Sequence, residues 1–408
     1  MWLFIQPNDA LFLRDGRSFD AGGNLYAGNL FPPYPTTCYG MLRTLLVHQV
    51  SPQVDYKDFF NTVPDNYKEL LGNKKEMGTL AVKGPFFGNK DNENIQLYVP
   101  CPADIFYKKE DDDDENTQRK WYLLQPDSKA CLSDFSDMET PFLKLRFYDE
   151  DKGSDFEPEN HMIGEHMLMQ YLMGQTDRSF LADYTKEEPF WQEESSTIIE
   201  REDSTLTAKE HQLAFPAYTR MGENKGLLLY IDDSLAPRFK GVLINRFGGE
   251  GRVCHVENRT VNNFPDQNQI IERIGTSGRF KVLLTSPGYF KDNAYYPDFL
   301  KGNQGSLPEG EWEINGIRKR VRLMTMAVKR ADRIGGWDLA KGVPKAMIKA
   351  VPAGSVFYFE IADYERSKDM DWVKELVISG LPGTLPGGDT DYCKQGFNTF
   401  LTGGWDYV

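Results

Sequence analysis

The apolar segments of this chain are all short, and their length limits the folds that it can adopt. The longest runs, LLLYI at 227–231 and VFYF at 356–359, have the length of strands. Crossing a bilayer as a helix takes about 20 consecutive apolar residues, so no segment is predicted to span a membrane. The opening MWLFIQP has neither the charged nor the apolar region of a signal peptide. We therefore expect a globular, cytoplasmic protein with no membrane partner.

Strands outnumber helices in the first half of the chain. The prolines of FPPYPTT at 31–37 exclude a continuing helix or a central strand. A helix is predicted directly after them, because Cys38, Met41, Leu42, Leu45 and Leu46 recur at helical spacing. The remaining predictions for this half are strands at 2–13, 79–87 and 95–107 and a helix at 162–174.

The same pattern begins again at about residue 205. Strands are predicted at 226–233, 241–252, 280–290 and 355–363, followed by a helix at 369–379 and a glycine-rich end at 396–405. Two α+β units of the ferredoxin-like kind, each β-α-β-β-α-β, fit this order better than a long alternating α/β series. We predict two tandem domains with large insertions, at 1–204 and 205–408, and an acidic insertion at 110–115.

The sequence gives little support for metal, disulfide or nucleotide chemistry. The five cysteines are an odd number and form no C-x-x-C pair, which argues against disulfides and zinc. His161 and His166 are five residues apart, so on a helix they would point about 140° apart and would not share a metal. The chain has no phosphate-binding P-loop and no G-x-S-x-G motif. We expect no cofactor and no metal.

The distribution of charge matters more than its sum. A net charge of −14 argues against a nucleic-acid partner, since phosphates are neutralised by Lys and Arg. However, residues 314–349 contain ten Lys and Arg against Asp332 and Asp338, a local balance of +8. A solvated positive face and an anion-binding site both remain open for this run.

Three further stretches combine cations, glycine and aromatic residues. LFLRDGRSFDAGG at 11–23 places two arginines around an Asp-Gly turn, and FGGEGR at 247–252 gives backbone that can approach a phosphate beside an arginine. Ordinary turns with solvated arginines are the alternative for both. RADRIGGWDLAKGVPK at 330–345 interleaves cations with Trp337, which suits a single nucleic-acid strand. KQGFNTFLTGGW at 394–405 loosely follows the glycine-aromatic strands that stack RNA bases.

Together these stretches resemble one family along the whole chain. The resemblance is to the third-numbered subunit of the type III-B CRISPR Cmr effector complex, in the RAMP superfamily. It is carried by LFLRDGRSFDAG, LFPPYPTT with Gly40 and Arg43 in the next helix, GGEGR at 248–252, VLLTSPGYF at 282–290, GGWDLAKGVPKAMIKAVPAGSVFYFE at 335–360 and GFNTFLTGGW at 396–405.

This resemblance implies tandem ferredoxin-like, RRM-like RAMP domains and a role in antiviral defence. It implies binding of the repeat-derived 5′ handle of the CRISPR RNA and docking to the large polymerase-like subunit and the adjacent RAMP backbone subunits. Target RNA would be met only indirectly, and the chain would not cut RNA. In the superfamily's glycine-rich signature, Asn398 stands where a second glycine is expected, and asparagine tolerates a left-handed backbone.

From the residues and the resemblance we predict one set of RNA contacts and no catalytic residue. If about five phosphates are neutralised, log affinity should fall with log salt at a slope of about −3.5. A metal-independent RAMP endoribonuclease that processes repeat RNA through His48 or His255 is the alternative, and a protein-binding spacer is a third reading. The predicted RNA-binding residues are Arg14, Arg17, Arg43, Gly248, Gly249, Arg252, Arg318, Lys319, Arg320, Lys329, Arg330, Arg333, Trp337, Lys345, Gly396, Phe397 and Gly404.

Overall fold

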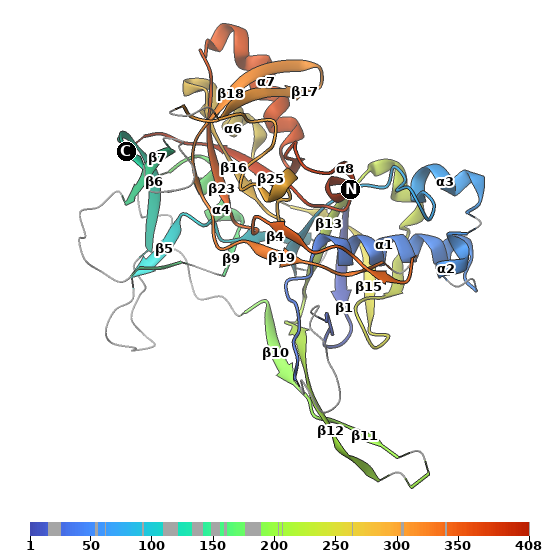
Figure 1. Cartoon of the computed structure of the whole chain (residues 1–408). Helices are drawn as coiled ribbons and strands as arrows, with labels where there is room; N and C mark the ends of the chain where they lie inside the picture. The colour runs from blue at the N-terminus through green and yellow to red at the C-terminus, as the bar shows by residue number, and fades with distance from the viewer. Residues whose placement is uncertain are drawn as a thin grey trace.

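The fold combines helices with two large, mainly antiparallel sheets (Figure 1). The structure is a computed structural model. It describes residues 1–14, 26–53, 56–61, 63–91, 94–108, 121–132, 142–147, 156–158, 161–175, 189–202, 204–205, 207–262, 264–302, 306–338 and 341–407.

The first large sheet has seven strands in the order β14-β15-β1-β13-β3-β4-β9. Its first strand in the chain, β1, lies between two strands that come much later, with Trp2 opposite Tyr230 of β13 and Arg259 of β15. The far end of β15 also pairs with β4, so the sheet curls toward closure. The strands are β1 (Trp2–Pro7), β3 (Val82–Asp91), β4 (Asn94–Pro100), β9 (Met162–Gly164), β13 (Lys225–Ile231), β14 (Val242–Arg246) and β15 (Val253–Val261).

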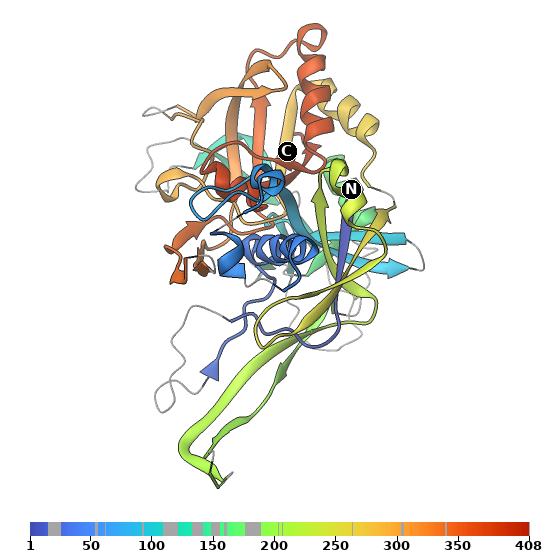
Figure 2. The ribbon, with the colours of Figure 1, turned by 90° about the vertical axis from the view of Figure 1, so that its right-hand side faces the viewer.

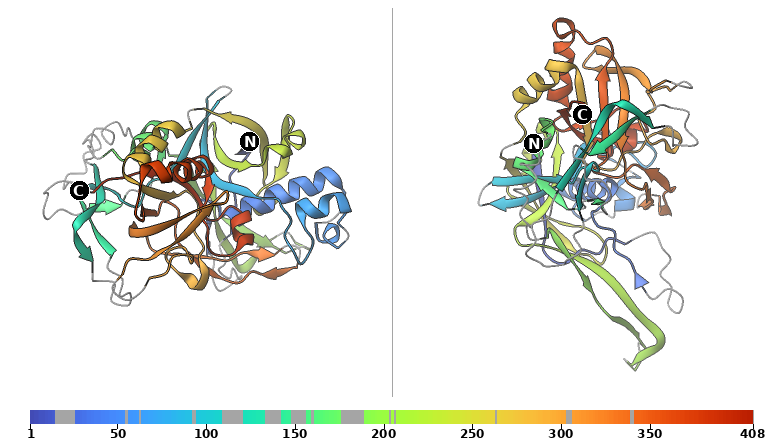
Figure 3. Two further views of the ribbon diagram at one scale, coloured as in Figure 1. Left: turned by 90° about the horizontal axis from the view of Figure 1, so that it is seen from above. Right: turned by 90° about the vertical axis from the view of Figure 1, so that its left-hand side faces the viewer.

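Helix α1 (Pro35–Val50) covers one face of this sheet. It begins at Pro35, where the fixed backbone angle of proline suits a first helical residue. Leu42 and Leu46 of α1 are fully buried in one cluster with Leu3 and Leu229 of the sheet. Two short helices follow, α2 (Tyr56–Phe59) and α3 (Asp65–Leu71). Seen from above, α1–α3 and the strands β6 and β7 lie at opposite ends of the molecule (Figure 3).

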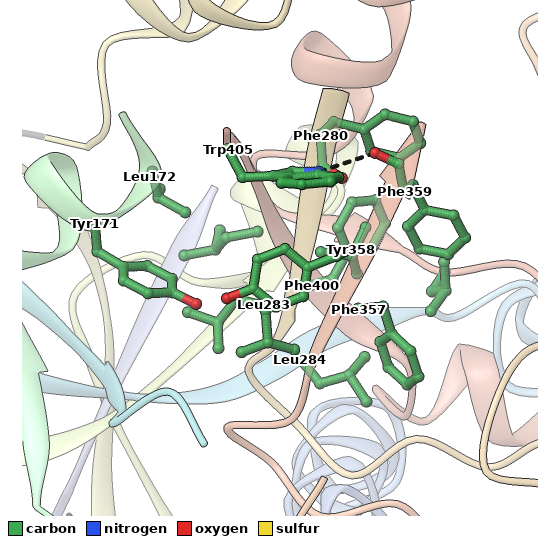
Figure 4. Packing of buried hydrophobic residues seen from close by; sticks show 14 of the residues in the cluster. Tyr171, Leu172, Phe280, Leu283, Leu284, Phe357, Tyr358, Phe359, Phe400 and Trp405 are labelled. Atoms are coloured by element: carbon green, nitrogen blue, oxygen red, sulfur yellow. Dashed lines mark hydrogen bonds between the residues drawn. The ribbon is translucent and has the colours of Figure 1, made fainter. Parts of the chain in front are cut away.

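The second large sheet has six strands in the order β17-β18-β23-β16-β25-β24. Its aromatic core is dense: the rings of Phe280 and Phe359 stack at 5.1 Å, and the Trp405 indole donates to both of their backbone carbonyls (Figure 4). Helices α6 (Gln267–Ser277) and α7 (Arg366–Ser379) pack together beside it. The strands are β16 (Arg279–Leu284), β17 (Glu309–Ile314), β18 (Ile317–Ala327), β23 (Val356–Ile361), β24 (Gly383–Thr384) and β25 (Thr399–Gly404).

The remaining strands form smaller sheets around these two. β12 (Ala208–Met221) pairs with β10 (Trp191–Ser195), β11 (Ile198–Arg201) and β2 (Tyr26–Ala27), and this ribbon projects from the body as a long arm (Figure 2). The other elements are β5 (Ile105–Lys108), β6 (Trp121–Leu132), β7 (Phe142–Phe147), β8 (Phe156–Pro158), β19 (Asp332–Ile334), β20 (Trp337–Asp338), β21 (Val343–Pro344), β22 (Ile348–Ala350), α4 (Glu165–Leu172), α8 (Thr390–Lys394) and the 3-10 helices η1 (Asp233–Arg238) and η2 (Lys291–Asn293).

The predicted mixture of helices and antiparallel strands is confirmed in this coarse form. The expected boundary at 204–205 falls in the connection between β11 and β12, whereas β13, β14 and β15 complete the sheet that β1 begins. The chain therefore changes from one large sheet to the other only after Val261. The acidic stretch at 110–115 lies outside the described residues. Within the described ranges, no helix is long and apolar enough to cross a membrane.

A buried polar cluster joins the two sheets. Tyr171 of α4 and Tyr358 of β23 both donate to the carboxylate of Asp104, the former at 2.8 Å. The ammonium group of Lys281 in β16 lies 3.5 Å from the centre of the Tyr171 ring. Burial raises the pKa of Asp104 and lowers that of Lys281 from 10.5 to about 7. The junction is thus fixed by a polar network as well as by apolar packing.

Candidate nucleic-acid interface

The chain start, the arm and the glycine turn meet at the base of the arm. Leu11 and Thr219 exchange two backbone hydrogen bonds of 2.7 and 2.9 Å, which attach the chain after β1 to β12. The Gly249 N–H donates to the Phe12 carbonyl at 2.7 Å. These bonds bring Arg14 and Arg252 into the same region, although more than 200 residues separate them in the sequence.

The arginines at this base are matched by carboxylates. Arg252 donates to Asp9 at 2.5 Å, and Arg220 donates to the other oxygen of Asp9 at 3.0 Å and to Glu194 at 3.1 Å. Glu250 lies 3.5 Å from Arg252. The Ala10 N–H, and then Arg220 and Arg252, hold the pKa of Asp9 below its ordinary value. An incoming phosphate must therefore compete with carboxylates for these cations.

A buried aromatic side chain packs against this cluster, since Tyr218 is only 7% exposed. The guanidinium carbon of Arg252 lies 5.0 Å from the centre of the Tyr218 ring, and the Phe12 ring packs against Tyr218 at 5.4 Å. The Tyr218 hydroxyl donates to Glu250 at 3.1 Å. The Tyr218 ring therefore supports the guanidinium group of Arg252 and offers no open face to a base.

The glycines of the 247–252 turn serve packing in this structure. Gly248 has φ 84°, and a Cβ there would lie 2.8 Å from the Phe12 carbonyl oxygen. A Cβ on Gly249 would lie 3.0 Å from the Phe12 ring. Both glycines thus allow the turn to approach the chain after β1, rather than forming the open phosphate cradle that the sequence suggested. Arg14 is exposed, and Arg17 lies outside the described residues.

A second group surrounds Trp337 on the short ribbons β19–β22 and β20–β21. The Trp337 ring is 55% exposed, unusual for tryptophan, and Lys345 lies beside it across the β20–β21 turn, where its backbone N–H donates to the Gly336 carbonyl at 2.8 Å. Arg330 and Arg333 are exposed and Lys329 is half-buried. Burial lowers the pKa of Lys345, and the nearby charge of Arg43 lowers it further. An exposed indole among cations suits base stacking.

Arg43 connects this group to helix α1. Its guanidinium donates to the Leu71 carbonyl at 2.7 Å and lies 3.9 Å from the centre of the Phe60 ring. Arg43 therefore holds α2 and α3 against α1 in this structure, while its charge reaches Lys345. Tyr34, just before α1, packs with Ile334 of β19, so the chain from Asn29 to Tyr34 links the two cationic groups.

The basic residues of β18 lie elsewhere, on a hairpin with β17. Arg318 pairs with Glu313, Lys319 with the buried carboxylate of Asp369, and Arg320 with Asp363 at 2.8 Å. Across the hairpin, Arg318, Arg320 and Arg322 lie opposite Glu313, Glu311 and Glu309 of β17. The basic residues at 314–349 therefore do not form one positive surface, because those of β18 are paired with acidic residues.

The glycine-rich end serves the interior. Phe397 is fully buried beside Ile334 and Ile348, so it has no face for a base, and the stacking role expected from the sequence is not the role it has here. Gly396 has φ 102° and touches Gly84 of β3, where a Cβ would lie 2.5 Å from the carbonyl oxygen. Gly404 is buried in β25, against Arg273. Asn398 has φ 59°, which confirms the expected left-handed backbone.

The sequence reasoning missed Tyr218 and Arg220. Both lie in β12 and are separated by one residue, so they face the same side of the strand. The alternation in AYTRM was the available signal. Among the described residues, no group of His, Cys, Asp and Glu side chains is arranged to hold a metal ion.

Comparison with known proteins identifies the chain. The family model described as CRISPR-associated protein (Cas_Cmr3) matches residues 3–405. The chain belongs to this family. The resemblance of its sequence motifs to the third-numbered Cmr subunit is thereby confirmed for this Cmr3-family protein.

Solved structures similar to the Cmr3-family chain include two at 16% sequence identity. One is from "Cryo-EM structure of the Type III-B Cmr-beta bound to cognate target RNA", with a TM-score of 0.47, covering 98% of this chain and 96% of that one. The other is from the same assembly bound to cognate target RNA and AMPPnP, state 1, with a TM-score of 0.45, covering 92% and 88%. No curated protein sequence matches the chain.

Proposed function

We propose that this protein is a non-catalytic RNA-binding subunit of a type III-B CRISPR Cmr ribonucleoprotein in the cytoplasm. It binds the repeat-derived 5′ handle of the CRISPR RNA and docks to the large polymerase-like subunit and the adjacent RAMP backbone subunits. Target RNA is met only through the assembly. Membership of the Cmr3 family over residues 3–405 is the observation that carries this proposal.

The geometry adds two RNA-facing regions to that proposal. At the base of the arm, the segment that carries the exposed Arg14 is hydrogen-bonded beside the turn that carries Arg252. The segment from Asn29 to Tyr34 links this region to the second one. There the indole of Trp337 is exposed, and Lys345 lies beside it. Arginines that position phosphates and a ring that stacks a base are the parts that single-strand binding requires.

We also propose that both large sheets are ferredoxin-like units of the RAMP kind. The order β15-β1-β13-β3 places the fourth and third strands of a unit on either side of its first, and β25-β16-β23-β18 repeats this arrangement. Two interleaved β-α-β crossings produce this order. The first unit has α1 in its first crossing, and the second has α7 in its second crossing.

The positions of the histidines favour binding over cleavage. His255 lies between Cys254 and Val256, which both pack in the cluster that contains α1. Since side chains alternate along a strand, His255 faces away from α1, whereas His48 is in the last turn of that helix. His48 and His255 therefore lie on opposite faces of the sheet and do not pair with each other, so cleavage through either one would need a different acid–base partner.

The test uses the assembled complex and handle RNA over a series of salt concentrations. Arg14→Ala combined with Arg252→Ala should weaken handle binding and make the salt slope shallower by about 0.7 for each lost phosphate contact. Arg366→Ala is the matched control, because Arg366 of α7 pairs with Glu272 of α6, away from the arm. Unchanged affinity and slope in the double variant would refute the assigned role.

Incubation of the chain with repeat RNA separates the alternative. Binding without products supports the proposal. Cleavage that is lost in either His48→Ala or His255→Ala would instead support the endoribonuclease.

A further inference from the structure

The edge strand β14 differs from the other sheet edges in its exposed side chains. Among the described strands it pairs only with β15, which leaves its other edge available for hydrogen bonding. Val242 is 57% exposed and Ile244 is 66% exposed. Exposed apolar strands at a sheet edge invite pairing with another chain, and proteins normally protect them.

These two side chains project from one face of β14. Asn245 donates to the Met41 carbonyl of α1 at 2.8 Å, and Leu243 packs in the cluster that contains α1. Because side chains alternate along a strand, Val242 and Ile244 lie on the face opposite α1. Further along the sheet that face is covered, since Phe4, Phe86 and Leu228 belong to the core shared with the second sheet. At β14 it is left exposed.

The other edges of the two large sheets are protected. β9 has three residues and β24 has two, which is too short to attract a partner strand. β17 has six residues, but Glu309, Glu311 and Glu313 alternate along it. Of the four edges, only β14 presents two adjacent large apolar side chains on a strand of five residues.

Charge also distinguishes β14. Exposed cations flank the strand, Lys240 before it and Arg246 at its end. Glu257, which lies opposite Val242, already forms ion pairs with Lys90 at 3.0 Å and with Arg259 at 2.8 Å. An incoming strand with acidic residues beyond its apolar pair therefore matches this edge in both hydrogen bonding and charge.

We infer that β14 is a docking edge for an extended, acid-flanked apolar segment of a neighbouring protein subunit. The segment adds a strand beside Val242–Arg246, and its alternate apolar side chains cover Val242 and Ile244. RNA fits less well, since branched aliphatic side chains offer no flat face for a base. This inference rests on the proposed function, because it takes the partner from the same assembly.

The test compares the whole chain alone and within the complex reconstituted from its purified subunits. Hydrogen exchange of the amides at 241–246 should slow on assembly. A photoreactive p-benzoylphenylalanine at position 244 should crosslink to a peptide of another subunit. The same residue at position 378, where Ile378 on α7 is similarly exposed at 53%, is the control and should give no such crosslink.

A substitution measures the strength of docking. Val242→Thr with Ile244→Thr keeps the branched shape and strand preference but removes apolar surface, and it should weaken incorporation into the complex by roughly tenfold. Ile378→Thr should leave incorporation unchanged. Guide RNA crosslinked to this chain in each assembled particle is measured in parallel and reports the proposed function separately. A crosslink from position 244 to RNA or to a second copy of this chain, or exchange at 241–246 that is unaffected by assembly, would overturn the inference.

Discussion

Asn398 offers the sharpest test of how the loops beside the second sheet are held together. Its side chain accepts a hydrogen bond from the Tyr289 N–H at 2.7 Å and donates to the carbonyls of Gly387 at 3.1 Å and Leu385 at 3.2 Å. It is fully buried, and its backbone is left-handed at φ 59°. One residue thus joins three loops next to the contact of Gly396 with β3.

Asn398→Ala removes these bonds and keeps the backbone conformation. A buried polar group without a partner costs about 1–3 kcal/mol, and the Tyr289 N–H and two carbonyls are affected, so the lost bonds should cost about 3 kcal/mol. A left-handed backbone costs alanine roughly 1 kcal/mol more. The free energy of unfolding should therefore fall by about 4 kcal/mol. Asn398→Gly loses the same bonds without the backbone strain and should cost about 3 kcal/mol.

Urea unfolding followed by tryptophan fluorescence measures both variants. Asn224→Ala is the matched control, since Asn224 also has a left-handed backbone, at φ 57°, but lies exposed in a turn. It should lose only roughly 1 kcal/mol. If Asn398→Ala costs no more than Asn224→Ala, the three-loop hydrogen-bond argument is wrong.

Four further outcomes are expected. Asp9→Asn should tighten binding of handle RNA at low salt, because it removes a carboxylate that competes for Arg252; weaker binding in a titration would contradict this. Trp337→Ala should reduce crosslinking of guide RNA to this chain without changing the melting temperature, since the ring is exposed. Phe397→Ala should lose about 3–5 kcal/mol in urea unfolding, because the ring is fully buried. Burial lowers the pKa of Lys281 from 10.5 to about 7, so between these pH values the unfolded chain binds more protons than the folded chain. The free energy of unfolding should therefore rise as the pH increases from about 7 to about 9. Lys281→Met should remove this rise in thermal melts across that range.

Periodicity in the sequence predicted only part of the strands and helices. β23 lies within a predicted strand, β13 and β16 each begin one residue before one, and α7 includes the predicted helix at 369–379. The strands β12, β17 and β18 and the helices α2, α3, α6 and α8 were not predicted. Helix α6 was missed although its signals are present: Asp266 caps it by accepting from Asn268 and Gln269, and Gly278 ends it at φ 70°.

The sequence predicted the residue types of the site better than their partners. The segment that carries Arg14 is hydrogen-bonded beside the turn that carries Arg252, but the pairing of Arg252 with Asp9 was not anticipated. Phe397 was predicted to contact RNA, but its ring is buried in the protein core. The glycine-aromatic pattern is the same for a ring that stacks on RNA and for a ring that fills a core. Only tertiary contacts distinguish these cases, and they come from segments distant in the chain.

The order of strands in the first sheet has a consequence for synthesis. β1 is made first, but both of its neighbours, β13 and β15, leave the ribosome more than 200 residues later. Contacts between such distant segments close slowly. The strand β1 therefore cannot complete its pairing until translation has passed Val261, and we expect this sheet to form late in folding.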